Sequence, residues 1–155
     1  MANILWGKPK ISIGEAGGTA TPISATPVEN STSLSTSRGE KHEAKIEGGG
    51  NEAVRYDRGT FTLEFEVRFA NGRTMPLQDK CEDGYIKGGP YKVVVEAADD
   101  ATAPTMTLNA AEGSYEDLYS ADEGARRHYY FDSTVPQSGN QIDWDTTASG
   151  SGGSV

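Results

Sequence analysis

Hydrophobic and polar positions alternate with a period of two along much of the chain, most clearly between residues 60 and 69. Five apolar side chains alternate there with five polar ones: Phe61, Leu63, Phe65, Val67 and Phe69 with Thr60, Thr62, Glu64, Glu66 and Arg68. Successive side chains of a β-strand point to opposite faces, so this pattern predicts a strand with one apolar face. Burial of the five apolar side chains would contribute roughly 10 kcal/mol, at about 1.5–3 kcal/mol each, and we expect them to anchor the core.

The same alternation recurs more weakly in six other segments. They are residues 10–13, 41–47, 91–97, 105–108, 125–131 and 141–144. Glycine-rich turn signals lie between several of them, at residues 48–51, 71–72 and 88–90. The pattern therefore predicts a mainly β fold, an antiparallel β-sandwich or barrel of about seven or eight strands.

Helical signals are weak and short. Residues 74–82 fit two turns, with Pro76 near the start and Gly84 after the end. Residues 114–120 contain the capping-box spacing of Ser114 and Asp117. We expect one short flanking α-helix, for which the first segment is the better candidate.

Length and composition predict a single domain over residues 1–145, because domains usually have about 100–200 residues. Residues 14–38 are rich in Gly, Ala, Ser, Thr and Pro, which is typical of a long flexible loop or arm. Residues 146–155 have the Gly/Ser composition of a disordered tail. The first residues lack the apolar region of a secretory signal, and no long apolar run would cross a membrane, so we expect a cytosolic protein.

The formal net charge of −9 is concentrated in the C-terminal part of the chain. Acidic and basic side chains balance over residues 1–95, whereas Arg126 and Arg127 are the only cations of residues 96–155. An acidic chain lacks the basic patches on which nucleic-acid binding depends. The charge therefore indicates either a solvated surface or a wall that repels phosphate.

Residues that could support catalysis are sparse. One cysteine, Cys81, and two histidines, His42 and His128, stand without a Gly-x-Ser-x-Gly elbow or a zinc-type spacing. Carboxylate pairs such as Glu64 with Glu66 are common on surfaces, and the glycine-rich stretches lack the lysine of a P-loop. We therefore expect no enzyme activity, no cofactor and no metal site.

The order of segments supports a family resemblance. LWGKPKI is followed by PVENSTSLSTSRGEKHEAKIEGG, then by YDRGTFTLEFEVRF and finally by YYFDSTVPQSGNQIDW. This order resembles the major tail tube proteins of tailed bacteriophages and prophages, over nearly residues 3–145. The resemblance implies a β-sandwich with a flanking helix, assembled in the bacterial cytoplasm into stacked hexameric rings of the virion tail.

In such a tube the partners are copies of the chain, other tail proteins, and DNA that passes through the lumen without specific binding; no membrane is involved. The resemblance makes the polar face of Thr60, Thr62, Glu64, Glu66 and Arg68 a candidate lumen wall or ring interface. It also implies that residues 14–38 contact neighbouring rings and become ordered on assembly.

The sequence is also compatible with two other functions. One is a carbohydrate-binding or adhesin-like β-sandwich, for which Tyr129, Tyr130 and Trp144 are the closest grouping of aromatic side chains. The other is a different structural protein of a phage tail or baseplate.

Overall fold

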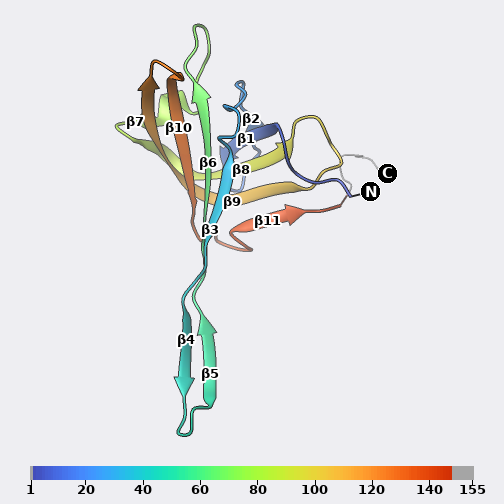
Figure 1. The fold of residues 1–155 in the computed structure, drawn as a ribbon, viewed down its shortest axis with the longest axis vertical. Helices are drawn as coiled ribbons and strands as arrows, with labels where there is room; N and C mark the ends of the chain where they lie inside the picture. Colours follow the sequence, from blue (N-terminus) through green and yellow to red (C-terminus); the bar gives the residue numbers. More distant parts are fainter. Residues whose placement is uncertain (1, 148–155) are drawn as a thin grey trace.

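The computed structural model describes residues 2–147, which form a mainly β fold without an α-helix in that range. Eleven strands and one 3-10 helix make up its regular structure (Figure 1). They are β1 (Pro9–Glu15), β2 (Thr21–Pro22), β3 (Ser33–Ser37), β4 (Lys41–Lys45), β5 (Asn51–Tyr56), β6 (Thr60–Arg68), η1 (Gln78–Lys80), β7 (Cys81–Glu82), β8 (Tyr85–Ala97), β9 (Thr105–Ser120), β10 (Gly124–Ser133) and β11 (Ile142–Asp145). The predicted mainly β class is confirmed, whereas the number of strands exceeds the expected seven or eight.

Nine strands form one antiparallel sheet, and two form a separate hairpin. The main path of the sheet runs β2-β1-β8-β9-β10-β6-β3, with β11 paired to β9 and β7 paired to β8. The separate hairpin is β4-β5. All strand pairs are antiparallel, as the alternating pattern of the sequence favours.

The sheet has two halves, one around β10 and β6 and the other around β1 and β11, and the long strands β8 and β9 take part in both. Residues 111–120 of β9 pair with β10, whereas residues 105–108 pair with β11 along the same edge. The register of β8 against β9 shifts between Ile86 and Tyr91, where Gly88, Gly89 and Pro90 lie. Irregularities of this kind bend strands, so the two halves of the sheet can lie on either side of one core. The expected turn at residues 88–90 is thus an irregularity inside β8.

The core lies between these two halves. One half contributes buried side chains of β6 and β10, and the other contributes those of β1, β8 and β9. The Phe65 ring stacks on Tyr129 at a centroid distance of 5.0 Å and on Phe131 at 6.0 Å, while Tyr91 meets Phe131 edge-on at 6.4 Å. Aromatic packing of this geometry adds to the stability gained from burial alone.

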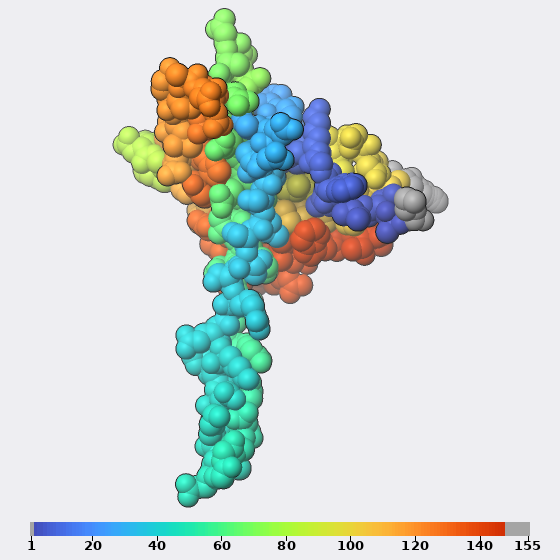
Figure 2. Space-filling model, viewed as in Figure 1, coloured from blue at the N-terminus to red at the C-terminus, as the bar shows by residue number. Residues whose placement is uncertain are grey.

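An arm, residues 40–57 with the hairpin β4-β5, projects from the body of the molecule (Figures 1 and 2). It continues the β3-β6 hairpin, whose last pair is Ser37 with Thr60. Between the two hairpins, at Gly39 and Gly59, the two segments of backbone approach each other closely. A Cβ atom on Gly39 would collide with the carbonyl of Asp57, which explains why glycine stands at this crossing.

The expectation of a flanking α-helix is wrong. Within residues 74–82 the chain forms the single 3-10 turn η1 and then β7, after Leu77 takes a positive φ of 54°. Residues 114–120 belong to β9, where every residue from Ser114 to Ser120 faces a partner on β10. Cross-strand pairing overrides the local helix signal there.

The segment that projects from the body is also a different part of the chain from the one that the sequence predicts. Residues 14–38, expected to be free, contain the end of β1, all of β2 and all of β3. They contact the sheet further where the Val28 N–H donates to the Glu66 carbonyl at 2.8 Å. The segment that projects is residues 40–57 instead. The expected Gly/Ser tail lies outside the described residues from position 148 onward.

Candidate assembly surfaces

The polar side chains of β6 lie on one face of the sheet together with polar side chains of β10 and β9. Pairing places Arg68 beside Arg126, Glu66 beside His128, Glu64 beside Tyr130, and Thr62 beside Asp132. On the next strand, Glu116 lies opposite His128 and Glu112 opposite Asp132. We call this surface the polar face: Thr60, Thr62, Glu64, Glu66, Arg68, Arg126, His128, Tyr130, Asp132, Glu112, Ser114 and Glu116. Its carboxylates outnumber its cations.

His128 joins the polar face into a hydrogen-bonded cluster. Its Nδ1 lies 2.8 Å from Glu66 Oε2, and its Nε2 lies 2.8 Å from Glu64 Oε1. Arg126 Nε is 3.3 Å from the other oxygen of Glu66. Burial alone would lower the pKa of His128, but the hydrogen bonds to Glu66 and Glu64 outweigh it and raise that pKa. A protonated ring can donate from both nitrogens, which suits two carboxylate acceptors.

Two further hydrogen bonds join four other side chains of the polar face. The Tyr130 hydroxyl donates to Glu116 at 2.7 Å, and this hydrogen bond raises the pKa of Tyr130 to about 12. The Thr62 hydroxyl donates to Asp132 at 2.8 Å. The polar face is therefore an organised layer of paired groups rather than a row of independent solvated side chains.

The apolar side chains of the 60–69 segment divide by burial. Leu63, Phe65 and Val67 are fully buried, and Phe61 packs against the core from a half-buried position. Phe69 departs from the expected core role: it lies beyond the end of β6 and is 41% exposed. The chain turns away just after it, so Phe69 lies at the rim of the sheet.

Arg127 covers the edge of the core beside Phe69. Its guanidinium group lies 5.1 Å from the Phe69 ring centroid and 4.3 Å from that of Tyr115. It also donates to both carboxylate oxygens of Asp117, at 2.6 and 3.2 Å, which raises the pKa of Arg127. Burial raises the pKa of the nearby Cys81 thiol, so that its reactive thiolate form is disfavoured.

The arm presents both of its faces to solvent. Every residue of β5 is exposed, and in β4 only His42 is half-buried. Three large apolar side chains are among the exposed ones: Ile46, Val54 and Tyr56. The space-filling view shows the arm standing free of the body along its length (Figure 2). A two-stranded ribbon of this kind is marginally stable by itself in water.

A second apolar surface lies beside the N-terminal segment. A groove of about 240 Å³ is lined mainly by Leu5, Trp6, Leu34 and Trp144. Trp6 is 76% exposed, and Trp144 is also exposed. The aromatic grouping expected from the sequence is not brought together, because Tyr129 is buried in the core and Tyr130 lies on the polar face.

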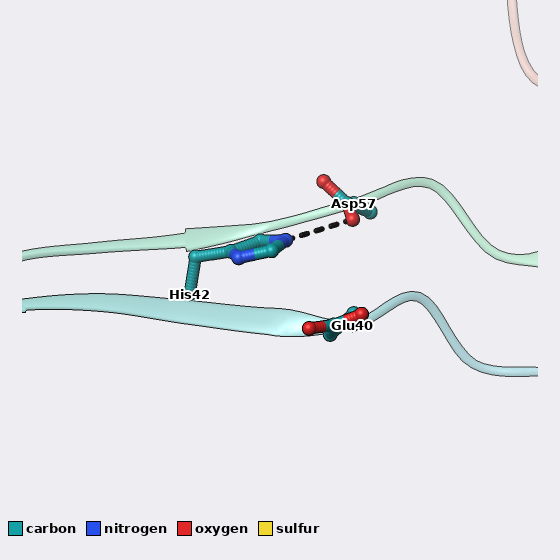
Figure 3. Close-up of side chains that lie close together, drawn as sticks. All are labelled: Glu40, His42 and Asp57. Carbon is teal, nitrogen blue, oxygen red and sulfur yellow. Dashed lines mark hydrogen bonds and ion pairs between the residues drawn. The ribbon is translucent and has the colours of Figure 1, made fainter.

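One mixed cluster lies at the root of the arm. Glu40, His42 and Asp57 each place a ligating atom within 4.8 Å of the others (Figure 3). His42 Nε2 and Asp57 Oδ2 are 2.9 Å apart. Among residues 2–147, this is the one group of three or more His, Cys, Asp or Glu side chains with such a spacing.

The sequence predicts β4 of the arm, within residues 41–47, and the turn after it, but it missed β5 and the side-chain clusters, for different reasons. β5 lacks the apolar alternation that reveals a buried strand, because neither of its faces is buried. The His128 cluster needs the register of β10 against β6, which a single sequence does not supply. The spacing of Glu64 and Glu66 on one face was the available signal.

Comparisons with known proteins supply no family. Neither a scan against protein-family models nor a search of curated proteins finds a match to this chain. Within residues 2–147, no helix is long and apolar enough to cross a membrane.

Proposed function

We propose that this chain is a structural subunit of a phage tail tube, and that copies of it assemble into stacked hexameric rings around a conduit for DNA. The observation that carries the proposal is the arm. Its ribbon stands clear of the body with Ile46, Val54 and Tyr56 exposed. Since an isolated ribbon is marginally stable, a neighbouring surface that covers it would stabilise it.

The body of the molecule supports the same proposal. It has open strand edges, and closure of several copies into a ring would pair or cover such edges. The polar face carries more carboxylates than cations, so as a lumen wall it would repel the phosphates of passing DNA. The resemblance in segment order points to the same family of tail proteins.

Electron microscopy of the concentrated full-length chain tests the proposal. We expect six-fold rings or tubes in negative stain, and a concentration-dependent rise in mass by light scattering. A chain that stays monomeric at all concentrations and forms neither rings nor tubes contradicts the proposal.

A variant of the arm separates assembly from folding. Replacing Ile46, Val54 and Tyr56 by Ser should abolish rings and tubes and leave the circular dichroism spectrum unchanged, because these side chains lie outside the core. The matched control replaces Glu47 and Glu52 of the same arm by Gln and should assemble. Normal assembly of the triple Ser variant would exclude the arm as the contact.

A binding module remains the second candidate, and the groove beside Trp6 and Trp144 is the observation that favours it. Exposed aromatic rings in a groove suit stacking against sugar rings. Binding of the monomer to a glycan array, lost on Trp6→Ala and Trp144→Ala substitution, would support this function over assembly. Another tail or baseplate role would instead give rings that do not stack.

A further inference from the structure

The residues at the root of the arm have the chemistry of a metal site. Glu40 lies just before β4, His42 lies within it, and Asp57 follows β5 on the opposite strand of the ribbon. The three side chains lie close together at the same end of the ribbon, and the His42 ring reaches toward Asp57 on the other strand (Figure 3). One imidazole and two carboxylates form a mixed nitrogen and oxygen set, which suits Zn²⁺ and related divalent transition metals.

We propose that Glu40, His42 and Asp57 bind a divalent transition metal, with Zn²⁺ as the best-suited ion. Two ligand atoms held about 2.1 Å from one tetrahedral ion are roughly 3.4 Å apart. The His42 and Asp57 atoms are 2.9 Å apart, and the widest separation in the set is within 4.8 Å. Side-chain movements of about 1 Å would bring all three to bonding distance, and exposed side chains make such movements readily.

The neighbouring charges are compatible with a cation at this place. Arg55 Nη2 lies 3.9 Å from Asp57 Oδ1, so it approaches the carboxylate oxygen that does not face His42. Lys41 is engaged with Glu43 at 3.7 Å. The two ligand carboxylates together offset the charge of a divalent ion. Water would complete the coordination, since the site is open to solvent.

Metal binding requires one particular tautomer of the His42 ring. Its Nε2 must offer a lone pair to the ion, so the ring proton resides on Nδ1 in the bound form. The hydrogen bond between His42 and Asp57 is then replaced by two bonds to one ion.

The metal would tie together the two strands of the arm where they leave the body. Asp57 already donates its N–H to the Glu40 carbonyl at 2.8 Å, so the ion would reinforce an existing link between these strands. No residue of β4 or β5 belongs to the core cluster, so contacts at the root determine how firmly the arm is held. The site goes beyond the proposed function, because it exists in the single chain whether or not copies assemble.

Titration of the full-length chain, without an affinity tag, with ZnCl₂ tests the site by calorimetry. We expect one binding event per chain. His42→Gln should abolish it, and Glu40→Gln or Asp57→Asn should weaken it on the order of 10-fold or more, because loss of even an outer-shell partner costs about 10–100-fold. The controls His128→Gln and Cys81→Ser remove the other histidine and the cysteine, and should bind as the wild type does.

Nuclear magnetic resonance of the ring nitrogens adds a readout that is independent of affinity. The chain contains two histidines, so the His42 and His128 signals can be assigned with the two Gln variants. Zn²⁺ should shift the His42 signals and leave those of His128 in place. No binding up to about 1 mM Zn²⁺, binding that survives His42→Gln, or binding that His128→Gln abolishes would each overturn the proposal.

Discussion

At the scale of single residues, the alternating segment 60–69 contains two aromatic side chains that differ in burial, although the pattern predicts the same role for both. Phe65 is fully buried between Tyr129 and Phe131, whereas Phe69 lies exposed at the rim. Both are aromatic, and both fall on the apolar face of the same alternating segment. They therefore form a matched pair for measuring what burial contributes.

Phe65→Ala should lower the free energy of unfolding by about 3–5 kcal/mol, because it removes a buried ring and leaves a cavity. Phe69→Ala should cost less than about 1 kcal/mol, the usual value of an exposed contact between a ring and a guanidinium group. Urea denaturation of the two variants measures the difference. Equal losses would mean that Phe69 is buried in the folded protein.

His128 makes stability depend on pH. The pKa of His128 is raised in the folded state, so the contribution of its protonated form is fully present below about 6.5, the ordinary value for histidine. It is lost as the pH rises through the raised folded-state value.

Comparison with His128→Gln tests this linkage. The wild type should be more stable than the variant by roughly 1 kcal/mol near pH 6, the order of magnitude of a hydrogen bond to a charged group. This advantage should shrink toward pH 9. The measurement is urea denaturation of both proteins across that range, and a difference that does not change with pH would contradict the role assigned to His128.

At the scale of elements, the arm and the body are separable. The β3-β6 hairpin ends with the pair of Ser37 and Thr60, and no residue of β4 or β5 belongs to the core. Replacing residues 38–59 by Asn-Gly would close this hairpin with a two-residue turn, which such a register accommodates. We expect the stability of the body to change by less than about 1 kcal/mol, which corresponds to a shift in Tm of no more than about 4 °C.

Thermal unfolding followed by circular dichroism checks this expectation. A single cooperative transition close to that of the wild type is the expected result. Loss of cooperativity would show that the arm supports the body. The matched control is an arm in which residues 46–50 are replaced by Asn-Gly, so that the pair of Lys45 and Asn51 is closed by a two-residue turn.

The alternating pattern predicts strands most clearly where one face is buried, although it also predicts β4, which is almost wholly exposed. The segment at 60–69 was recognised as a strand because three of its apolar side chains face the core. Local signals predict a helix over residues 74–82, because they do not show that the residues after the 3-10 turn at 78–80 pair with β8. Residues 14–38 look like a loop in composition, and Ser33–Ser37 pairs with β6 through its backbone regardless.

The candidate surfaces follow the same rule. The polar side chains of β6 were read from the pattern, but their partners on β10 and β9 depend on strand register. The cluster of Glu40, His42 and Asp57 depends on the pairing of β4 with β5, and β5 has no buried face that would reveal it. A single sequence does not show which segments that are distant along the chain contact one another.

At the scale of the whole molecule, the negative charge lies mainly in residues 96–155, which supply β9, β10 and β11. β9 contributes Glu112 and Glu116 to the polar face, beside the carboxylates of β6. If this face lines the lumen, DNA should not stay in wild-type tubes at physiological salt, because binding to DNA depends on cationic contacts with phosphate.

Reversing two charges of the polar face distinguishes a lumen from an outer surface. Glu112→Lys and Glu116→Lys together leave Glu64 and Glu66, the hydrogen-bond partners of His128, in place, and remove one contact of the polar face, the hydrogen bond from Tyr130 to Glu116. Tubes of this variant should retain short double-stranded DNA at low salt and release it as the salt concentration rises. Co-sedimentation measures retention, and nuclease treatment then locates the DNA. Protected DNA would place the polar face inside the tube; DNA that is retained but digested would place this face on the outside, where it could only serve contacts between tubes or other tail proteins.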